Sequence, residues 1–275
     1  MAVSSRPSPG SVHAGAAVTG PLWQGVAVAL VTFFDAEGGV DHAATAEHAV
    51  RLVGTGVRAV LVAGSTGEAD ALTDTERVAL VAAVRHAVPA GVPVLAGASA
   101  AWTGQAVARV ADAVGAGADA VLVAPPGRCR EVAGFYRQVV AAADGRPVLA
   151  YHFPGVAGGP VPVEALGELG ELPVAGVKDS SGDAERLLRE LAAWNGWTYV
   201  GSSALVGFAG LVGAAGAVLA VANAYPQECL AAFGGDGAAQ RRLLAAHLAA
   251  RADFPHGLKA MVAQRFGTPV RARLG

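Results

Sequence analysis

Residues 174–181 read Val-Ala-Gly-Val-Lys-Asp-Ser-Ser, an apolar run that ends abruptly in charged and polar residues. A strand covered on both faces shows such a continuous apolar run, whereas a strand with one face in solvent alternates apolar and polar residues. The stretch therefore predicts a buried parallel strand with Lys178 near its carboxyl end.

Runs of the same kind recur along the chain, and stretches rich in Ala and Leu separate them. These stretches have the composition of helices, and several begin with capping residues: Asp41, Thr103, Asp183, and Thr73 with Glu76 as a capping box. Including residues 174–181, we count eight runs, the others being 26–34, 59–64, 93–98, 120–125, 147–154, 198–203 and 216–223.

Regular alternation of strands and helices predicts an α/β fold, and eight units favour a closed (β/α)₈ TIM barrel. An open doubly wound sheet is the alternative. We expect residues 1–21, rich in Ser, Pro, Gly and Ala, to form a flexible N-terminal arm. Residues 22–224 would form the barrel, and residues 225–275 a C-terminal helical extension.

The composition restricts the partners of the chain. With 53% hydrophobic and only 15% charged residues, the chain has little polar surface to spare, which favours a homo-oligomer. Its net charge of −2 argues against binding of nucleic acid. No apolar run reaches the roughly 18 residues of a membrane helix. Cys129 and Cys229 belong to no cysteine cluster, so we expect both to be free thiols, and this is consistent with a reducing cytoplasm. Neither metal-ligand spacing nor a dinucleotide fingerprint is present, so we expect no metal and no cofactor.

Lys178 is the first of three chemical features at predicted strand ends, where barrel enzymes gather their functional groups. Burial favours the neutral amine over the ammonium ion, and a neutral amine can attack a ketone to form an imine. The alternative is an ordinary lysine that pairs with Asp179 or reaches solvent.

Tyr151 and the turn Gly64-Ser65-Thr66-Gly67-Glu68 are the other two features. A phenol at the end of a strand can relay a proton, although it can equally be a core tyrosine with a satisfied hydroxyl. Backbone N–H groups and the hydroxyls of Ser65 and Thr66 can bind a carboxylate, although such a turn is often only a loop.

Three motifs in this order are similar to those of the dihydrodipicolinate synthase / N-acetylneuraminate lyase family of class I aldolases. They are residues 64–68, residues 151–154 (Tyr-His-Phe-Pro) and residues 176–182 (Gly-Val-Lys-Asp-Ser-Ser-Gly). The resemblance implies a homotetrameric lyase in which Lys178 forms an imine with a 2-oxo acid, typically pyruvate, and Tyr151 transfers protons. It further implies that Ser65 and Thr66 hold the carboxylate, that Gly201 and Val218 line the pocket, and that Glu68 is structural.

Two departures from the synthases of this family bear on the second substrate. Val156 stands where those synthases carry an arginine, and after the fourth strand no tyrosine occurs until Tyr136, although Arg128 or Arg130 could supply a cation. We therefore expect a hydroxylated 2-oxo acid, cleaved to pyruvate and an aldehyde. A second possibility for the aldehyde product is an aromatic one, held in an apolar pocket around Phe153 and Val156.

Three other functions remain as alternatives at this point. The chain could be a dihydrodipicolinate synthase proper, or a sugar-acid dehydratase that uses the same imine. It could also be a non-catalytic relative that binds an oxo acid, because a fold does not determine a function.

Overall fold

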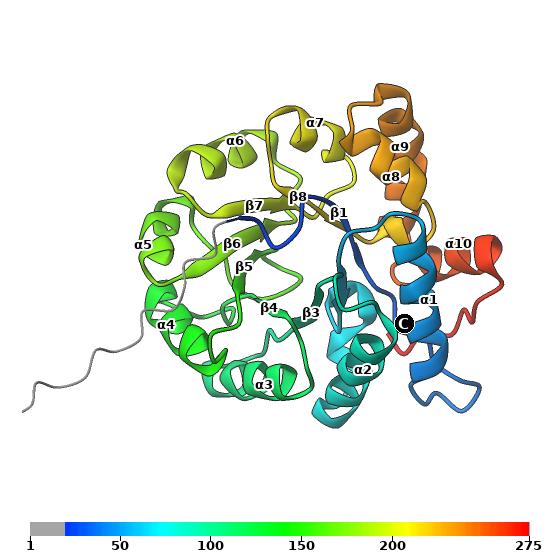
Figure 1. Ribbon diagram of the computed structural model, residues 1–275, viewed down its shortest axis with the longest axis horizontal. Helices are drawn as coiled ribbons and strands as arrows, with labels where there is room; N and C mark the ends of the chain where they lie inside the picture. Colours follow the sequence, from blue (N-terminus) through cyan, green and yellow to red (C-terminus); the bar gives the residue numbers. More distant parts are fainter. Residues whose placement is uncertain (1–19, 275) are drawn as a thin grey trace, which may run out of the picture.

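The computed structural model describes residues 20–274, so nearly all of the predicted N-terminal arm lies outside the described residues. Eight parallel strands follow one another around a closed barrel, and β8 pairs with β1 (Figure 1). The predicted TIM barrel is confirmed and the open sheet is excluded. The strands are β1 (Gly25–Ala29), β2 (Val60–Val62), β3 (Val94–Gly97), β4 (Ala120–Val123), β5 (Val148–His152), β6 (Val174–Asp179), β7 (Trp197–Val200) and β8 (Gly216–Leu219).

Most strands end earlier than the apolar runs that predicted them. The run 26–34, for example, continues past the end of β1 at Ala29, and its residues remain buried as far as Phe34. These residues leave the strand ladder but stay buried: Phe33 packs on His48 of α1 (His42–Gly54), and Phe34 lies under Lys259 and Arg273 near the C-terminus. Hydrophobicity reports burial and not hydrogen bonding, so the sequence alone could not separate strand from buried loop.

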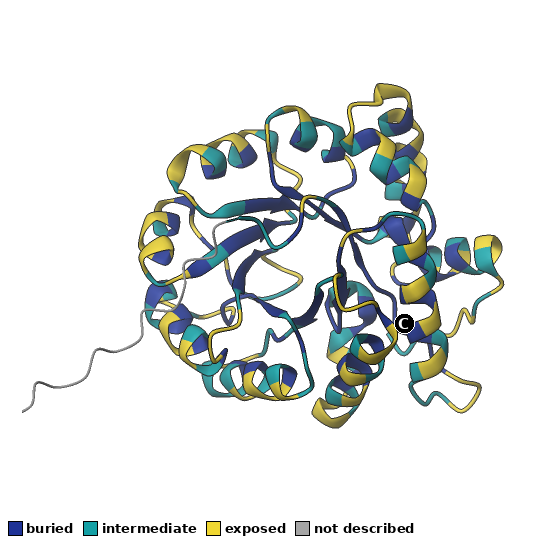
Figure 2. Ribbon diagram, viewed as in Figure 1, coloured by how far each residue is buried: buried dark blue, intermediate teal, exposed yellow. Residues whose placement is uncertain are grey.

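A ring of helices covers the barrel, with buried faces toward the strands and exposed faces outward (Figures 1 and 2). As predicted, Asp41 and Asp183 cap α1 and α6, and Thr73 with Glu76 forms a capping box on α2. Thr103 is instead the first residue of α3, after Trp102, and does not cap it. The ring contains α1 (His42–Gly54), α2 (Asp74–Ala87), α3 (Thr103–Gly115), α4 (Val132–Ala142), α5 (Leu166–Glu171), α6 (Ala184–Ala193), α7 (Val206–Leu211) and α8 (Pro226–Phe233).

The C-terminal region begins with a helix that belongs to the barrel. Helix α8 packs against both α7 and β1 and so completes the ring, whereas α9 (Gly237–Ala252) packs on α8, and α10 (His256–Phe266) on α9. Within the segment 225–275 that the sequence assigns to the extension, α8 thus covers the strands that close the barrel, and α9 and α10 lie outside it. Between residues 20 and 274, no helix combines the length and apolarity needed to cross a membrane.

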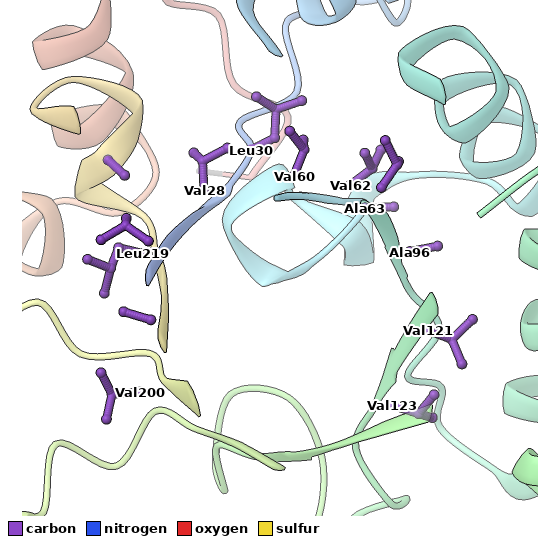
Figure 3. Close-up of a cluster of buried hydrophobic side chains, with 14 of the residues drawn as sticks. Val28, Leu30, Val60, Val62, Ala63, Ala96, Val121, Val123, Val200 and Leu219 are labelled. Carbon is purple, nitrogen blue, oxygen red and sulfur yellow. The ribbon is translucent and has the colours of Figure 1, made fainter. Parts of the chain in front are cut away.

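Two hydrophobic cores lie on opposite faces of the strands. The larger lies between strands and helices, and Figure 3 shows its side chains pointing outward from the ring of strands, among them Val60, Val121 and Leu219. The smaller fills the barrel and contains Leu149, Tyr151, Tyr199 and Val218. Successive residues of a strand point to opposite faces, so this division indicates which side chains face the interior.

Candidate active site

Lys178 faces the barrel interior at the end of β6. Its predecessor Val177 belongs to the outer core, so the alternation along the strand turns Lys178 inward and Asp179 outward. Lys178 is 4% exposed, and its ammonium forms no ion pair with any residue between 20 and 274. A buried lysine without a counter-charge is costly and therefore a candidate for chemistry.

Asp179 is engaged on the other face of the same strand. Its Oδ1 lies 3.5 Å from Nε of Arg186 on α6. The backbone N–H of Ser181 donates to Oδ1 at 3.0 Å, and the Ser181 hydroxyl donates to Oδ2 at 2.7 Å. The alternative in which Lys178 simply pairs with Asp179 or reaches solvent is excluded, because the two side chains point to opposite faces and Lys178 is buried.

Tyr151 is the neighbour of Lys178 on the adjacent strand. The two residues are register partners in the β5–β6 ladder, and Nζ of Lys178 lies 4.5 Å from the centroid of the Tyr151 ring. The ring face attracts the cation without neutralising it. Within residues 20–274 the Tyr151 hydroxyl has no hydrogen-bond partner, which leaves it available to a ligand. The two predicted catalytic side chains are thus in direct contact.

Gly201 lies beside Lys178, and Val218 lies beside Tyr151. A Cβ atom at Gly201 would lie 3.0 Å from Cε of Lys178 and 1.9 Å from Oγ of Ser180. Only glycine therefore leaves room for the lysine side chain at the end of β7. Val218 on β8 is 2% exposed and packs in the interior core with Tyr151.

Ser65 and Thr66 occupy a short 3₁₀ helix, Ser65–Gly67, directly after β2. Both residues are half-buried. The turn is held against the end of β1, where the Thr32 hydroxyl donates to the Gly67 carbonyl at 2.8 Å. A Cβ atom at Gly67 would lie 2.9 Å from the carbonyl oxygen of Leu30, so this close approach requires glycine.

A cavity of about 340 Å³ opens at this end of the barrel. Ser65 and Tyr151 both line it, so the predicted carboxylate-binding turn and the predicted proton-transfer group face one space. Thr66, Gly201, Val218 and Lys178 do not line it; the lysine contacts the cavity-lining ring of Tyr151.

Sequence reasoning missed the polar wall of this cavity. Asp70, Ser99, Gln105 and Arg109 line it, from the segments that follow β2 and β3. Arg109 is held in place because its Nε donates to Asp74 at 2.6 Å and its Nη1 to the Ser99 carbonyl at 2.7 Å. The signal was available, since these residues follow predicted strand ends, but the family motifs do not include them.

The substitutes considered for the missing synthase residues do not reach the cavity. Arg128 and Arg130 are exposed and line a different, shallow surface hollow with Glu131. Tyr136 is fully buried, and its hydroxyl donates to the Val123 carbonyl at 2.7 Å. Burial also raises the pKa of Tyr136 well above its usual range. Val156 does line the cavity and is 52% exposed.

His152 follows Tyr151 but serves the loop after β5. Its Nδ1 accepts a hydrogen bond of 3.0 Å from the backbone N–H of Val161. Burial and the positive charge of Arg186 lower the pKa of His152, which favours the neutral ring. Among the described residues, no group of three or more His, Cys, Asp or Glu side chains is placed to hold a metal ion.

Comparison with known proteins agrees with this geometry. The family model described as the dihydrodipicolinate synthetase family matches residues 22–245. The chain belongs to the dihydrodipicolinate synthetase family. This confirms the family resemblance inferred from the three motifs.

Relatives of this dihydrodipicolinate synthetase family member carry names of lyases and synthases. An uncharacterized DapA-like lyase of Halobacterium salinarum is 40% identical over 209 residues, which cover 74% of this chain and 68% of the relative. A 4-hydroxy-tetrahydrodipicolinate synthase of Corynebacterium aurimucosum is 35% identical, with 67% of each chain covered. The crystal structure of dihydrodipicolinate synthase DapA-2 from Bacillus anthracis superposes with a TM-score of 0.82 at 27% identity, covering 92% of this chain and 91% of that one.

Proposed function

We propose that this chain is a class I aldolase that joins or cleaves a 2-oxo acid, pyruvate, and an aldehyde through an imine on Lys178. The observation that carries the proposal is the buried amine of Lys178, which has no counter-charge within the described residues and packs on the ring of Tyr151. A non-catalytic oxo-acid binder has no need of such an amine, because a hydroxyl or an arginine would hold the ligand at lower cost.

The reaction follows from these groups. The Lys178 amine attacks the C2 carbonyl of pyruvate to give a carbinolamine, and water leaves as Tyr151 supplies a proton to the departing hydroxyl. Loss of a proton from C3 gives an enamine, whose carbon adds to the aldehyde carbonyl. Hydrolysis of the resulting imine releases the product and restores the amine, and cleavage is the reverse sequence. Ser65 and Thr66 donate hydrogen bonds to the carboxylate of the oxo acid throughout.

The walls of the cavity favour a polar aldehyde. Asp70, Gln105 and Arg109 present hydrogen-bonding groups to it, whereas Phe153 does not line it. A hydroxylated 2-oxo acid, cleaved to pyruvate and a hydroxyaldehyde, therefore fits better than an aromatic product. Val156 in place of the synthase arginine argues against a dihydrodipicolinate synthase proper.

Borohydride trapping tests the imine directly. The full-length chain is incubated with pyruvate and borohydride, and the adduct is located by intact and peptide mass spectrometry. We expect a pyruvate-sized adduct on the peptide that contains Lys178, and none on Lys178→Met. A folded wild-type chain that gives no adduct with pyruvate or with longer 2-oxo acids would overturn the proposal.

Product analysis separates the members of the family. A panel of deoxy sugar acids is incubated with the enzyme, and pyruvate is distinguished from a dehydrated oxo acid. Release of pyruvate and an aldehyde supports the aldolase. A dehydrated product identifies a dehydratase, and efficient condensation of pyruvate with aspartate semialdehyde identifies a synthase proper.

The proposal includes a homotetramer, the assembly implied by the family resemblance. Large apolar side chains remain exposed on the single chain, among them Trp102 at 64% and Leu211 at 82%, which supports burial of part of this surface against other copies. Light scattering on the purified chain measures the assembly, and a monomer at working concentration would contradict this part of the proposal.

A further inference from the structure

The carboxylate of Glu68 is fully buried at the end of the Ser65–Gly67 turn, where it binds the C-terminal segment of the chain. Its Oε1 lies 2.5 Å from Nζ of Lys259 on α10. Its Oε2 accepts hydrogen bonds from the backbone N–H groups of Arg273 and Leu274, at 2.7 and 2.8 Å. One carboxylate thus ties the turn after β2 to residues about 205 positions later in the chain.

Lys259 is itself fully buried and contacts the same segment. Its Nζ donates to the Arg271 carbonyl at 2.6 Å and lies 4.4 Å from the centroid of the Phe34 ring. A buried ion pair is seldom more stable than a well-packed apolar pair, so stability alone gives little reason for these two charges. A buried charge does, however, define one geometry, because each ion requires its partner at a set distance and direction.

The backbone conformation of the turn at Glu68 requires stabilising contacts. Glu68 has φ 54° and ψ 44°, a left-handed conformation that is unfavourable for a residue with a side chain. Its backbone N–H closes the turn by donating to the Ser65 carbonyl at 3.1 Å. Contacts of the Glu68 side chain therefore stabilise the conformation that sets the positions of Ser65 and Thr66.

The C-terminal segment is anchored independently of Glu68. The guanidinium of Arg273 pairs with both carboxylate oxygens of Glu76 on α2, at 2.9 and 2.6 Å, and donates to the carbonyls of Gly38 and Ala71, each at 2.9 Å. Arg271 donates to the Ala36 carbonyl. The segment is a fixed strap across the loop after β1 and the start of α2, close to the C label in Figure 1.

We propose that Glu68 is a positioning residue, and that the C-terminal strap, residues 268–274, acts through it to hold the Ser65 and Thr66 hydroxyls in the geometry that binds the carboxylate of the 2-oxo acid. The inference rests on the proposed function, since it concerns the same substrate. On the opposite side, Thr32 holds Gly67, so the turn is fixed between the end of β1 and the strap. Loosening the strap weakens oxo-acid binding while the amine of Lys178 stays intact.

The test is the borohydride trap, measured as a function of pyruvate concentration on the full-length chain. Glu68→Gln keeps the shape of the side chain and removes its charge. We expect the half-saturating pyruvate concentration to rise about tenfold, as for the loss of one charged hydrogen bond, with trapping at saturating pyruvate within about twofold of wild type. Arg273→Ala leaves the Glu68 side chain in place but removes the contacts that hold the strap to Glu76, Ala71 and Gly38. It should raise the half-saturating concentration about threefold.

Val262→Ala is the matched control, since Val262 is fully buried on the same helix as Lys259 but is absent from the Glu68 contacts. It should lower the thermal midpoint and leave the half-saturating concentration unchanged. Wild-type half-saturation in Glu68→Gln or, should that variant not fold, in Arg273→Ala overturns the inference, as does an equal rise in Val262→Ala. A wild-type chain that gives no adduct with any 2-oxo acid overturns the proposed function first, and this inference with it.

Discussion

The ammonium nitrogen of Lys178 lies 4.5 Å from the centroid of the Tyr151 ring, and the two residues are partners across the β5–β6 ladder. This contact brings the proposed nucleophile and the proposed proton donor together without an intervening residue. The next residue after the lysine, Asp179, makes its ion pair with Arg186 on the far face of the strand. The amine is therefore buried and close to a phenol, and no carboxylate of residues 20–274 neutralises it.

Replacement of Lys178 separates catalysis from stability. Lys178→Met keeps the length of the side chain and removes the buried amine, so we expect activity to fall by about 10³-fold or more. Because the substitution leaves no carboxylate unpaired in the described part of the chain, the thermal midpoint should stay the same or rise. Activity assays and thermal unfolding measure the two effects. Retention of wild-type activity would show that another group does the chemistry.

Removal of the Tyr151 hydroxyl should slow the reaction with little change in stability. Tyr151→Phe preserves the ring that packs on Lys178, and the hydroxyl has no partner within residues 20–274 whose hydrogen bond would be lost. Turnover should fall by about 10²–10⁴-fold, the range for a lost general acid or base. Steady-state kinetics and a melting curve are the measurements. Unchanged turnover would remove Tyr151 from the mechanism.

A methyl group at Gly201 should displace the lysine. The new Cβ would lie 3.0 Å from Cε of Lys178 and 1.9 Å from Oγ of Ser180, so both side chains must move. Because a shift of about 1 Å at a reacting group can cost 10²-fold, we expect a loss of that order in the trapping rate for Gly201→Ala. Gly167→Ala on α5, with no atom within 4 Å of the added Cβ, is the control. Equal rates in the two variants would contradict the prediction.

Stability should fall as the pH rises, because of Glu190. This residue is fully buried, and Arg186 faces both its carboxyl and that of Asp179. Burial, together with the negative charge of Asp179, raises the pKa of Glu190 from 4.5 to about 8. The folded state thus keeps a proton that the unfolded chain releases. The stabilising contribution is complete below pH 4.5 and is lost as the pH rises through about 8.

Thermal unfolding between pH 6 and pH 9 tests this sign. The thermal midpoint of the wild type should decrease over the interval, and the decrease should be smaller for Glu190→Gln, which has no proton to lose. Glu168→Gln, an exposed carboxyl on α5, should behave as the wild type. A Glu190→Gln variant that loses as much stability as the wild type would place the titration elsewhere.

Most of the fold could be predicted because it depends on local patterns. Continuous apolar runs identified every strand of the barrel, and capping residues such as Asp41 and Asp183 located helix starts. The errors have local causes as well. Thr103 is a residue type common at helix N-caps, but it is the first residue of α3 and does not cap it. Helix α8 completes the ring of helices although no further strand follows it.

The site could be predicted only where a motif marks it. Lys178, Tyr151 and Ser65 were found from their strand ends, and the structure places them at the carboxyl end of the barrel. The cavity wall with Gln105 and Arg109 was missed, because both residues lie on α3 and only folding brings this helix next to Ser65 and Asp70.

The sequence by itself determined the strand order, the helix starts and the lysine at the end of an apolar strand, since periodicity and capping act between residues a few positions apart. Tertiary structure alone decided that the amine of Lys178 has no counter-charge among the described residues, while Asp179 pairs outward. It also decided that the Glu68 carboxylate binds the C-terminal strap. Both outcomes depend on contacts between segments far apart in the chain, and only closure of the barrel and docking of α10 establish those contacts.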